Sequence, residues 1–387
     1  MKEFKELISQ NIRKFGMIIA LVGIVLIFQI LTSGILLTPL NITNIIMQNS
    51  YIIILAIGMV LVIITGEIDL SVGSVAAFIG AIAGTLMIRW NMPVIPSIII
   101  SLLVGALIGA WQGYWVAYVR VPAFIVTLAG MLLFRGLTMV VLSGRTLAPF
   151  PREFRFMSSS YMPDFFNGET YNITAIIIGI LAIVLFVFNE FRLRKARKKF
   201  HQKGLSGPLF LTKVIVISVI IALFTERLAV YAGIPYILLI LIALIAGYTF
   251  FMQKTIPGRH VYAVGGNEKA AQLSGVKSRK IKFWVYVNMG VLAALAGLIF
   301  AGRLNAATPQ AGNLFELDAI AAAVIGGASL TGGIGTAIGA VIGALIMGVL
   351  NNGMSLLGVG IDWQQAIKGL VLLGAVTFDI INKKRNA

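Results

Sequence analysis

The chain has no cysteine in 387 residues and only two histidines, His201 and His260. Without cysteine, disulfides and thiol chemistry are excluded. Both histidines fall in expected inter-helix loops with no carboxylate at ligand spacing, so no metal site is predicted. The phosphate-binding pattern G-x-x-x-x-G-K-S/T is absent, as is any acid–base cluster suited to hydrolysis. The sequence therefore predicts a protein that is not an enzyme and needs no cofactor.

Charge is also scarce. Only 12% of the residues are charged and 59% are hydrophobic, whereas roughly a quarter are charged in soluble domains. Apolar runs near or above about 18 residues recur from end to end, which is typical of a protein with many membrane spans. Only a helix bundle satisfies the backbone in such runs. We therefore predict an all-α polytopic membrane protein with about 10–12 membrane helices.

Some of these helices are expected to be short or broken. The predicted membrane segments cover about residues 17–37, 45–65, 72–88, 94–119, 123–143, 173–189, 214–224, 235–251, 283–301, 319–325, 334–350 and 366–381. The segment 319–325 is too short to cross alone and runs into the glycine-rich stretch Gly326–Gly333. A second glycine-punctuated break, Gly66–Gly73, precedes the third span. Broken helices in two halves of a chain are where transporter repeats place their substrate.

The distribution of basic residues predicts the orientation. Of the 31 Lys and Arg, 22 fall before the first span, in residues 191–213, in residues 253–282 or in the tail. One topology places all four segments on the same side, as the positive-inside rule requires. Both termini are thus predicted to be cytoplasmic, and residues 1–16 to form a basic interfacial helix. The net charge of +17 follows from topology, so no nucleic-acid partner is expected.

Glycine spacing predicts close helix packing. Gly105, Gly109 and Gly113 lie four residues apart in one span, and Gly335, Gly339 and Gly343 repeat this interval near another. Small residues at this spacing let helix backbones approach closely.

A few polar side chains are expected at membrane depth, where each is costly. Glu67 and Asp69 either cap the third span through its free N–H groups or line a permeation path. Arg135 is expected to pair with one of these carboxylates. The full set of buried-polar or path-lining candidates is Glu67, Asp69, Ser71, Arg135, Asn351 and Asn352.

The longest polar passage of the C-terminal half, Pro257–Lys282, lies between two spans. Asn267 is a suitable helix N-cap and Gly275 is placed to end a helix of two turns. Such a helix outside the membrane is either an ordered connection or a surface that a partner grips.

Five blocks carry a resemblance to a known family. They are GEIDLSVGS (66–74), FIVTLAGMLLFRG (124–136), GRHVYAVGGNEKAAQLSGV (258–276), ELDAIAAAVIGGASLTGGIGT (316–336) and NNGMSLLGV (351–359). Their order and content resemble the inner-membrane permeases of bacterial ABC monosaccharide importers, the ribose, xylose and galactoside group. The extra two-span insert at 173–231, with its basic loop 191–213, is similar to the xylose type. On this basis residues 1–387 form a single permease domain.

The resemblance implies how such a permease works. Two copies would form a homodimer in membrane lipid, a cytoplasmic ATPase with two nucleotide-binding cassettes would drive it, and a periplasmic or lipid-anchored protein would deliver the sugar, D-xylose or a related pentose. The loop 257–282 would couple to the ATPase through Asn267, Glu268, Lys269, Ala270, Ala271, Leu273, Ser274 and Gly275. The alternatives are a facilitator or ion-coupled sugar carrier without an ATPase, and an ABC permease for another sugar or small polar cargo.

Overall fold

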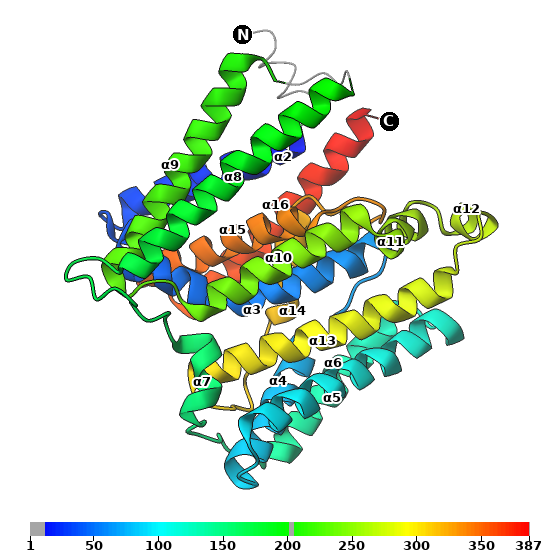
Figure 1. Cartoon of the computed structure of the whole chain (residues 1–387). Coiled ribbons are helices and arrows are strands. Elements are labelled where there is room, and N and C mark those ends of the chain that lie inside the picture. Colours follow the sequence, from blue (N-terminus) through cyan, green and yellow to red (C-terminus); the bar gives the residue numbers. More distant parts are fainter. Residues whose placement is uncertain (1–11, 201–204, 387) are drawn as a thin grey trace. The chain divides into compact units, whose positions relative to one another are not determined.

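A computed structural model describes residues 12–200 and 205–386, and every regular element in them is a helix (Figure 1). The helices are α2 Ile12–Leu31, α3 Pro39–Ile64, α4 Val72–Gly84, α5 Val94–Tyr114, α6 Ala123–Leu142, α7 Arg152–Ser159, α8 Ile173–Lys199, α9 Gly207–Tyr231, α10 Tyr236–Lys254, α11 Ile256–Gly266, α12 Glu268–Leu273, α13 Ser278–Leu304, α14 Phe315–Ile325, α15 Ala337–Leu356 and α16 Ile361–Asn386. Short π-helical turns, Thr85–Arg89 and Trp115–Val119, extend α4 and α5. The predicted all-α fold is confirmed.

Nine helices of the described chain are long and apolar enough to cross a membrane. The apolar part of α2, Gly16–Leu31, is shorter than these nine, and α14 has 11 residues. The predicted short helix at 319–325 is therefore present, although it begins four residues earlier. Most of the predicted interfacial helix 1–16 lies outside the described residues, and α2 begins at Ile12.

Three polar stretches contain more helix than the sequence indicated. In the basic loop 191–213, α8 continues to Lys199 and α9 already begins at Gly207. The polar segment 144–172 contains α7, and the loop 257–282 contains α11 in addition to the predicted short helix. Arg and Lys are good helix formers, so helices continue past the apolar stretch that the hydropathy pattern detects.

The chain divides into two compact units. The first consists of Met1–Leu36, Ile45–Ser159 and Ile237–Ala387, and the second of Leu37–Asn44 and Ser160–Tyr236. Residues 173–231, which the sequence suggests as an insert, all belong to the second unit. The residues of the candidate site described below all belong to the first.

Glycines hold α5 directly against α13 in the first unit, and Figure 1 shows the two helices side by side. A Cβ added to Gly105 would lie 2.6 Å from the carbonyl oxygen of Gly290, and one added to Gly109 would lie 2.3 Å from that of Tyr286. Neither oxygen can retreat, because each belongs to a helix backbone. The packing role predicted for the first glycine series is confirmed.

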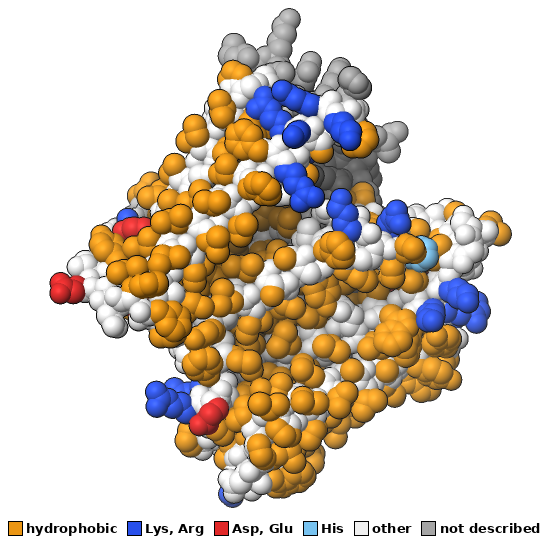
Figure 2. All heavy atoms as spheres, viewed as in Figure 1, with side chains coloured by type: hydrophobic (Ala, Val, Ile, Leu, Met, Phe, Trp, Pro, Cys, Tyr) orange, Lys and Arg blue, Asp and Glu red, His pale blue; other side chains and the backbone are white. Residues whose placement is uncertain are grey.

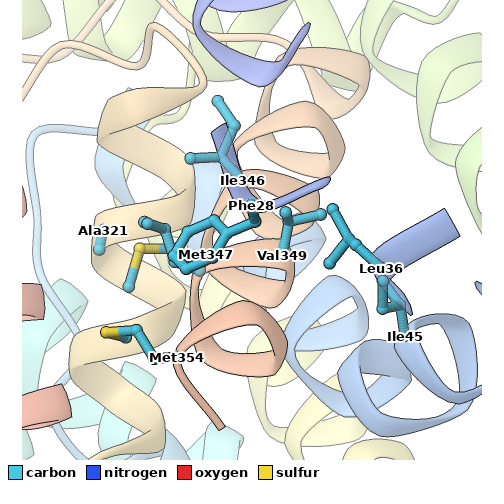
Figure 3. Close-up of a cluster of buried hydrophobic side chains, with 9 residues drawn as sticks. Phe28, Leu36, Ile45, Ala321, Ile346, Met347, Val349 and Met354 are labelled. Atoms are coloured by element: carbon cyan, nitrogen blue, oxygen red, sulfur yellow. The ribbon is translucent and has the colours of Figure 1, made fainter. Parts of the chain in front are cut away.

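A buried apolar cluster joins α2, α3, α14 and α15 (Figure 3). Phe28 and Met347 lie within it, at 8% and 1% exposure. The second glycine series serves the same region, since a Cβ on Gly343 would lie 1.9 Å from the carbonyl oxygen of Ala322. This contact is backbone to backbone, as predicted for closely packed membrane helices.

The second unit is built on the α8–α9 hairpin. Figure 2 shows hydrophobic side chains along this pair and basic side chains gathered where α8 ends and α9 begins. At the other end, the side chain of Asn172 caps α8 by accepting from the N–H of Ala175 at 2.8 Å. Asp164 accepts hydrogen bonds from four backbone N–H groups, of which those of Gly168 (2.8 Å) and Ile173 (3.1 Å) are the closest. Although partial desolvation opposes it, these donors lower the pKa of Asp164.

Candidate functional site

Two short helices connect α10 to α13 at the candidate coupling segment (Figure 1). Thr255 caps α11 by accepting from the N–H of Gly258 at 3.1 Å. Asn267 caps α12 by accepting from the N–H of Ala270 at 3.0 Å. Gly275 ends α12 with φ +85°, and its N–H donates to the carbonyl of Gln272 at 3.0 Å. The cap and the stop predicted from the sequence are both present.

The two faces of α12 differ in exposure. Ala271 is 6% exposed and faces the protein, whereas Leu273 is 91% exposed. Ala270, Lys269, Ser274 and Gly275 are also exposed. At 91% exposure the side chain of Leu273 has little contact with the rest of the chain, so it is accessible from outside.

Lys282 at the start of α13 connects α12 to the linker between α3 and α4. Its Nζ lies 2.9 Å from Oε2 of Glu268 and 2.7 Å from Oε1 of Glu67. Gln272 strengthens the connection by donating to Oγ of Ser278 at 2.7 Å. Desolvation opposes ionisation of Glu268, but the hydrogen bond and charge of Lys282 outweigh it and lower the pKa of this carboxyl.

Glu268 has a role within the chain, because its ion pair with Lys282 holds α12 to α13. Lys282 was not among the sequence candidates, although it is the last basic residue before the apolar run of α13. A cation directly beside an apolar run was the available signal, since it must find an anion or reach the surface.

A cavity of about 520 Å³ opens beside α12. It lies between α12, the start of α13 and the connection from α5 to α6, and it contains the Glu67–Lys282–Glu268 pairs. Arg120, Lys269 and Arg279 also line it. The cavity is open to one side of α12 and carries charge of both signs.

The end of α11 is held against the glycine-rich breaks by backbone contacts. A Cβ on Gly265 would lie 1.5 Å from the carbonyl oxygen of Ile64 at the end of α3. The N–H of Gly333 donates to the same oxygen at 2.9 Å. The hydroxyl of Tyr262 donates to the carbonyl of Gly335 at 2.7 Å. The candidate coupling segment therefore touches both α3 and the loop before α15.

The linker residues beyond Glu67 form a separate buried network. Asp69, 2% exposed, accepts from the N–H of Ser71 at 2.8 Å and from its hydroxyl at 2.7 Å. The amide of Gln112 on α5 donates to Oγ of Ser71 at 2.7 Å. Asp69 thus binds the residue that precedes α4, and neither it nor Ser71 makes a side-chain capping bond to the free N–H groups of α4. Gln112 was missed, although a glutamine inside an apolar span is itself a signal.

Arg135 does not pair with Glu67 or Asp69, and that prediction is wrong. Its Nη1 donates to Oδ1 of Asn313 at 3.1 Å, while Glu67 pairs with Lys282 and Asp69 with Ser71. The sequence gives residue spacing within a span but not the neighbours between spans, so the partner could not be read from it.

Asn351 and Asn352 lie on α15, away from the coupling segment in the sequence and in element contacts. Asn352 is 7% exposed and Asn351 is partly buried. Within the described residues no group of three or more His, Asp or Glu is arranged to hold a metal ion.

Residues 41–376 match the family described as the permease component of branched-chain amino acid transport systems. The chain belongs to this family. It is therefore a transport permease rather than an enzyme, as the sequence predicts.

The xylose transport system permease protein of Haemophilus influenzae is 42% identical over 377 residues, covering 97% of this chain and 98% of that protein. The Escherichia coli K12 protein of the same description is 41% identical over 383 residues, 99% and 95% of the two chains. The ribose import permease protein of Bacillus subtilis is 36% identical over 367 residues, 95% and 92%. No solved structure matches. The predicted resemblance to ABC monosaccharide-importer permeases, nearest to the xylose type, is confirmed, as is the multi-pass location in the inner membrane.

Proposed function

We propose that this chain imports D-xylose or a related pentose as a homodimeric permease subunit, powered by a separate ATPase and supplied by a sugar-binding protein. The xylose permeases that match nearly the whole chain support this substrate. They also support a division of labour in which the permease supplies the path and its partners supply energy and sugar.

One observation supports binding of an ATPase: the exposure of Leu273 on α12. Leu273 projects from α12 with 91% of its surface exposed, while the other face of α12 is fastened to α13 through Glu268 and Lys282. A rigidly held helix with an exposed apolar anchor fits the helix-in-groove mode of recognition. Asn267, Ala270, Ser274 and Gly275 form and end this helix, and the ATPase would grip its exposed surface.

Through the same contacts, a movement of α12 would shift the membrane helices to which it is joined. Lys282 connects α12 to Glu67, and Glu67 precedes the buried Asp69–Ser71 turn at the start of α4. Gly265 of α11 lies against the carbonyl of Ile64 at the end of α3, and Gly333 in the loop before α15 donates to the same oxygen. A displacement of the coupling segment therefore bears on both ends of the α3–α4 linker.

Glu67, Asp69 and Ser71 are better suited to bracing this linker than to touching sugar, because their polar atoms are already paired. Arg135 with Asn313 is the better candidate for a contact along the path. Both side chains are at least partly exposed, and a guanidinium beside an amide can hydrogen-bond sugar hydroxyls. Asn351 and Asn352 remain further candidates for the path.

The orientation proposed from the basic residues places α12 in the cytoplasm, where the ATPase would be. Because the chain has no cysteine, single cysteines can report it without background. A membrane-impermeant maleimide applied to spheroplasts should label cysteine at 168 and 313 but not at 266. Labelling at 266 would reverse the orientation.

The decisive experiment is Leu273→Asp in the complete transporter. A charge in the groove should release the ATPase and abolish sugar-stimulated ATP hydrolysis, while thermal stability of the permease alone stays unchanged. Leu357→Asp is the matched control, because Leu357 is also an exposed leucine, at 41%, but follows α15. It should leave both measurements unchanged.

Retention of the ATPase by the Leu273→Asp permease would show that the ATPase does not bind through α12. If the wild-type permease transports xylose in vesicles with no ATPase present, the ATPase-independent carrier is the correct function instead.

A further inference from the structure

A cleft of about 180 Å³ lies between α8 and α9 in the second unit. Four of its lining residues are cations: Arg194, Arg197, Lys198 and Lys213. Its single acid, Glu190, is paired with Lys213 at 2.7 Å. The other three cations have no acidic partner among the described residues, so the cleft carries a clear excess of positive charge.

The positive-inside rule does not account for this arrangement. It requires basic residues beyond the end of a span but is indifferent to the helix face they occupy. Arg194, Arg197 and Lys198 follow the spacing i, i+3, i+4, which places them on one face, and this face lines the cleft. The other basic residues at the end of α8 do not line it; they are Arg192, Lys195 and Lys199.

The cleft has a fixed polar group and an apolar side. The guanidinium of Arg194 lies 4.3 Å from the ring centroid of Phe210, and Phe210 is only 4% exposed. Stacking on a buried ring fixes the guanidinium plane, which suits two-pronged recognition of a phosphate. Leu193 and Leu205 complete the lining. A ligand with a phosphate beside apolar atoms would match both parts.

The position of the cleft along α8 indicates the source of that ligand. The apolar run of α8 ends at Phe188, and Arg194 lies about 9 Å further along the helix. The headgroup layer is about 5–8 Å thick on each side of the hydrocarbon core. Long side chains on a helix point back toward its N-terminus, so the guanidinium of Arg194 reaches back from the backbone into this layer. Below the cleft, the sides of the hairpin are apolar and exposed (Figure 2). We propose that this cleft binds the phosphate of an anionic phospholipid, whose acyl chains lie along α8 and α9.

The test compares two triple variants of the full-length chain that lose the same charge. R194Q/R197Q/K198Q removes the three cations of the cleft that have no acidic partner. R192Q/K195Q/K199Q removes three cations from the same helix end that do not line the cleft. Each protein is reconstituted in nanodiscs of phosphatidylcholine with one part in ten phosphatidylglycerol and analysed by native mass spectrometry. The cleft variant should retain about tenfold less phosphatidylglycerol, and the control variant should behave like the wild type.

R194K refines the result, because it keeps the charge and loses the planar group, so retention should fall by a smaller factor. Equal loss of lipid in both triple variants would overturn the site in favour of general surface charge, and equal retention in all proteins would overturn it outright. Displacement of the lipid by millimolar inorganic phosphate would identify a soluble anion as the ligand. Unchanged thermal unfolding of the R194K protein keeps the comparison independent of folding.

Discussion

Helices α3 and α9 are both apolar enough to cross a membrane, yet their surroundings are opposite. In the most apolar stretch of α3, 89% of the residues are buried in the protein, against 11% in α9. Within the first unit, Tyr51 of α3 packs against Phe300 and Phe315 on α13 and α14, and Gly58 faces Met289 of α13. In the second unit, α9 packs mainly on α8. Lipid tails are as apolar as leucine, so hydropathy reports that a helix leaves water but not what it touches. Burial follows from the neighbouring side chains instead.

The largest effect is expected where α3 ends against α11. Gly265→Ala would place a Cβ 1.5 Å from the carbonyl oxygen of Ile64. Backbone must move to relieve this contact, so we expect a loss of about 3 kcal/mol or more in unfolding free energy, together with loss of transport. Thermal unfolding in detergent and sugar uptake would measure both.

Gly266→Ala is the control for that change. It is the next residue, and nothing lies within 4 Å of its added Cβ. Stability should be unchanged or slightly higher, because alanine is the better helix former. If both variants behave alike, the junction between α3 and α11 is not tight.

The second test repeats one substitution on the two helices. Ile54 on α3 is fully buried, and Ile220 on α9 is 58% exposed. Ile54→Ala should cost about 2 kcal/mol or more because it leaves a cavity. Ile220→Ala should cost less than about 0.5 kcal/mol because lipid fills the space. Equal losses in reversible unfolding would show that α9 has a protein neighbour in the membrane.

The third test asks whether the linker after α3 depends on its ion pairs. Lys282→Met leaves Glu67 and Glu268 without their cation. Because the site is only partly buried, we expect a loss of about 1–2 kcal/mol and a larger fall in coupling between ATP hydrolysis and sugar uptake. Lys280→Met, at an exposed neighbour, should leave both unchanged.

Adding Glu67→Gln to Lys282→Met should recover part of the lost stability. A double variant as unstable as the sum of the two single variants would rule out a direct interaction between these side chains.

The smallest effect is expected in the second unit, at Asp164. Partial desolvation opposes ionisation of this carboxyl, but hydrogen bonds from backbone N–H donors outweigh it and lower the pKa of Asp164. Its stabilising contribution is therefore complete above the unfolded pKa of about 3.9 and declines as the pH falls toward the depressed folded value. In hydrogen-exchange measurements at neutral pH, amides 166–174 should exchange faster in Asp164→Asn than in the wild type. In acid, the exchange rates of the wild type should approach those of the variant. Equal protection in both proteins at neutral pH would contradict the role of the charge.

The sequence by itself determined the all-α membrane fold, the short helix near residue 320, the glycine packing and the family. It also determined the cap at Asn267 and the stop at Gly275. All of these depend on composition or on residues close in the chain, where spacing fixes geometry. Only the tertiary structure decided that Glu67 meets Lys282, that Arg135 meets Asn313, and that Gly265 touches Ile64. These partners are far apart in sequence, and among many equally apolar helices only packing selects which faces meet.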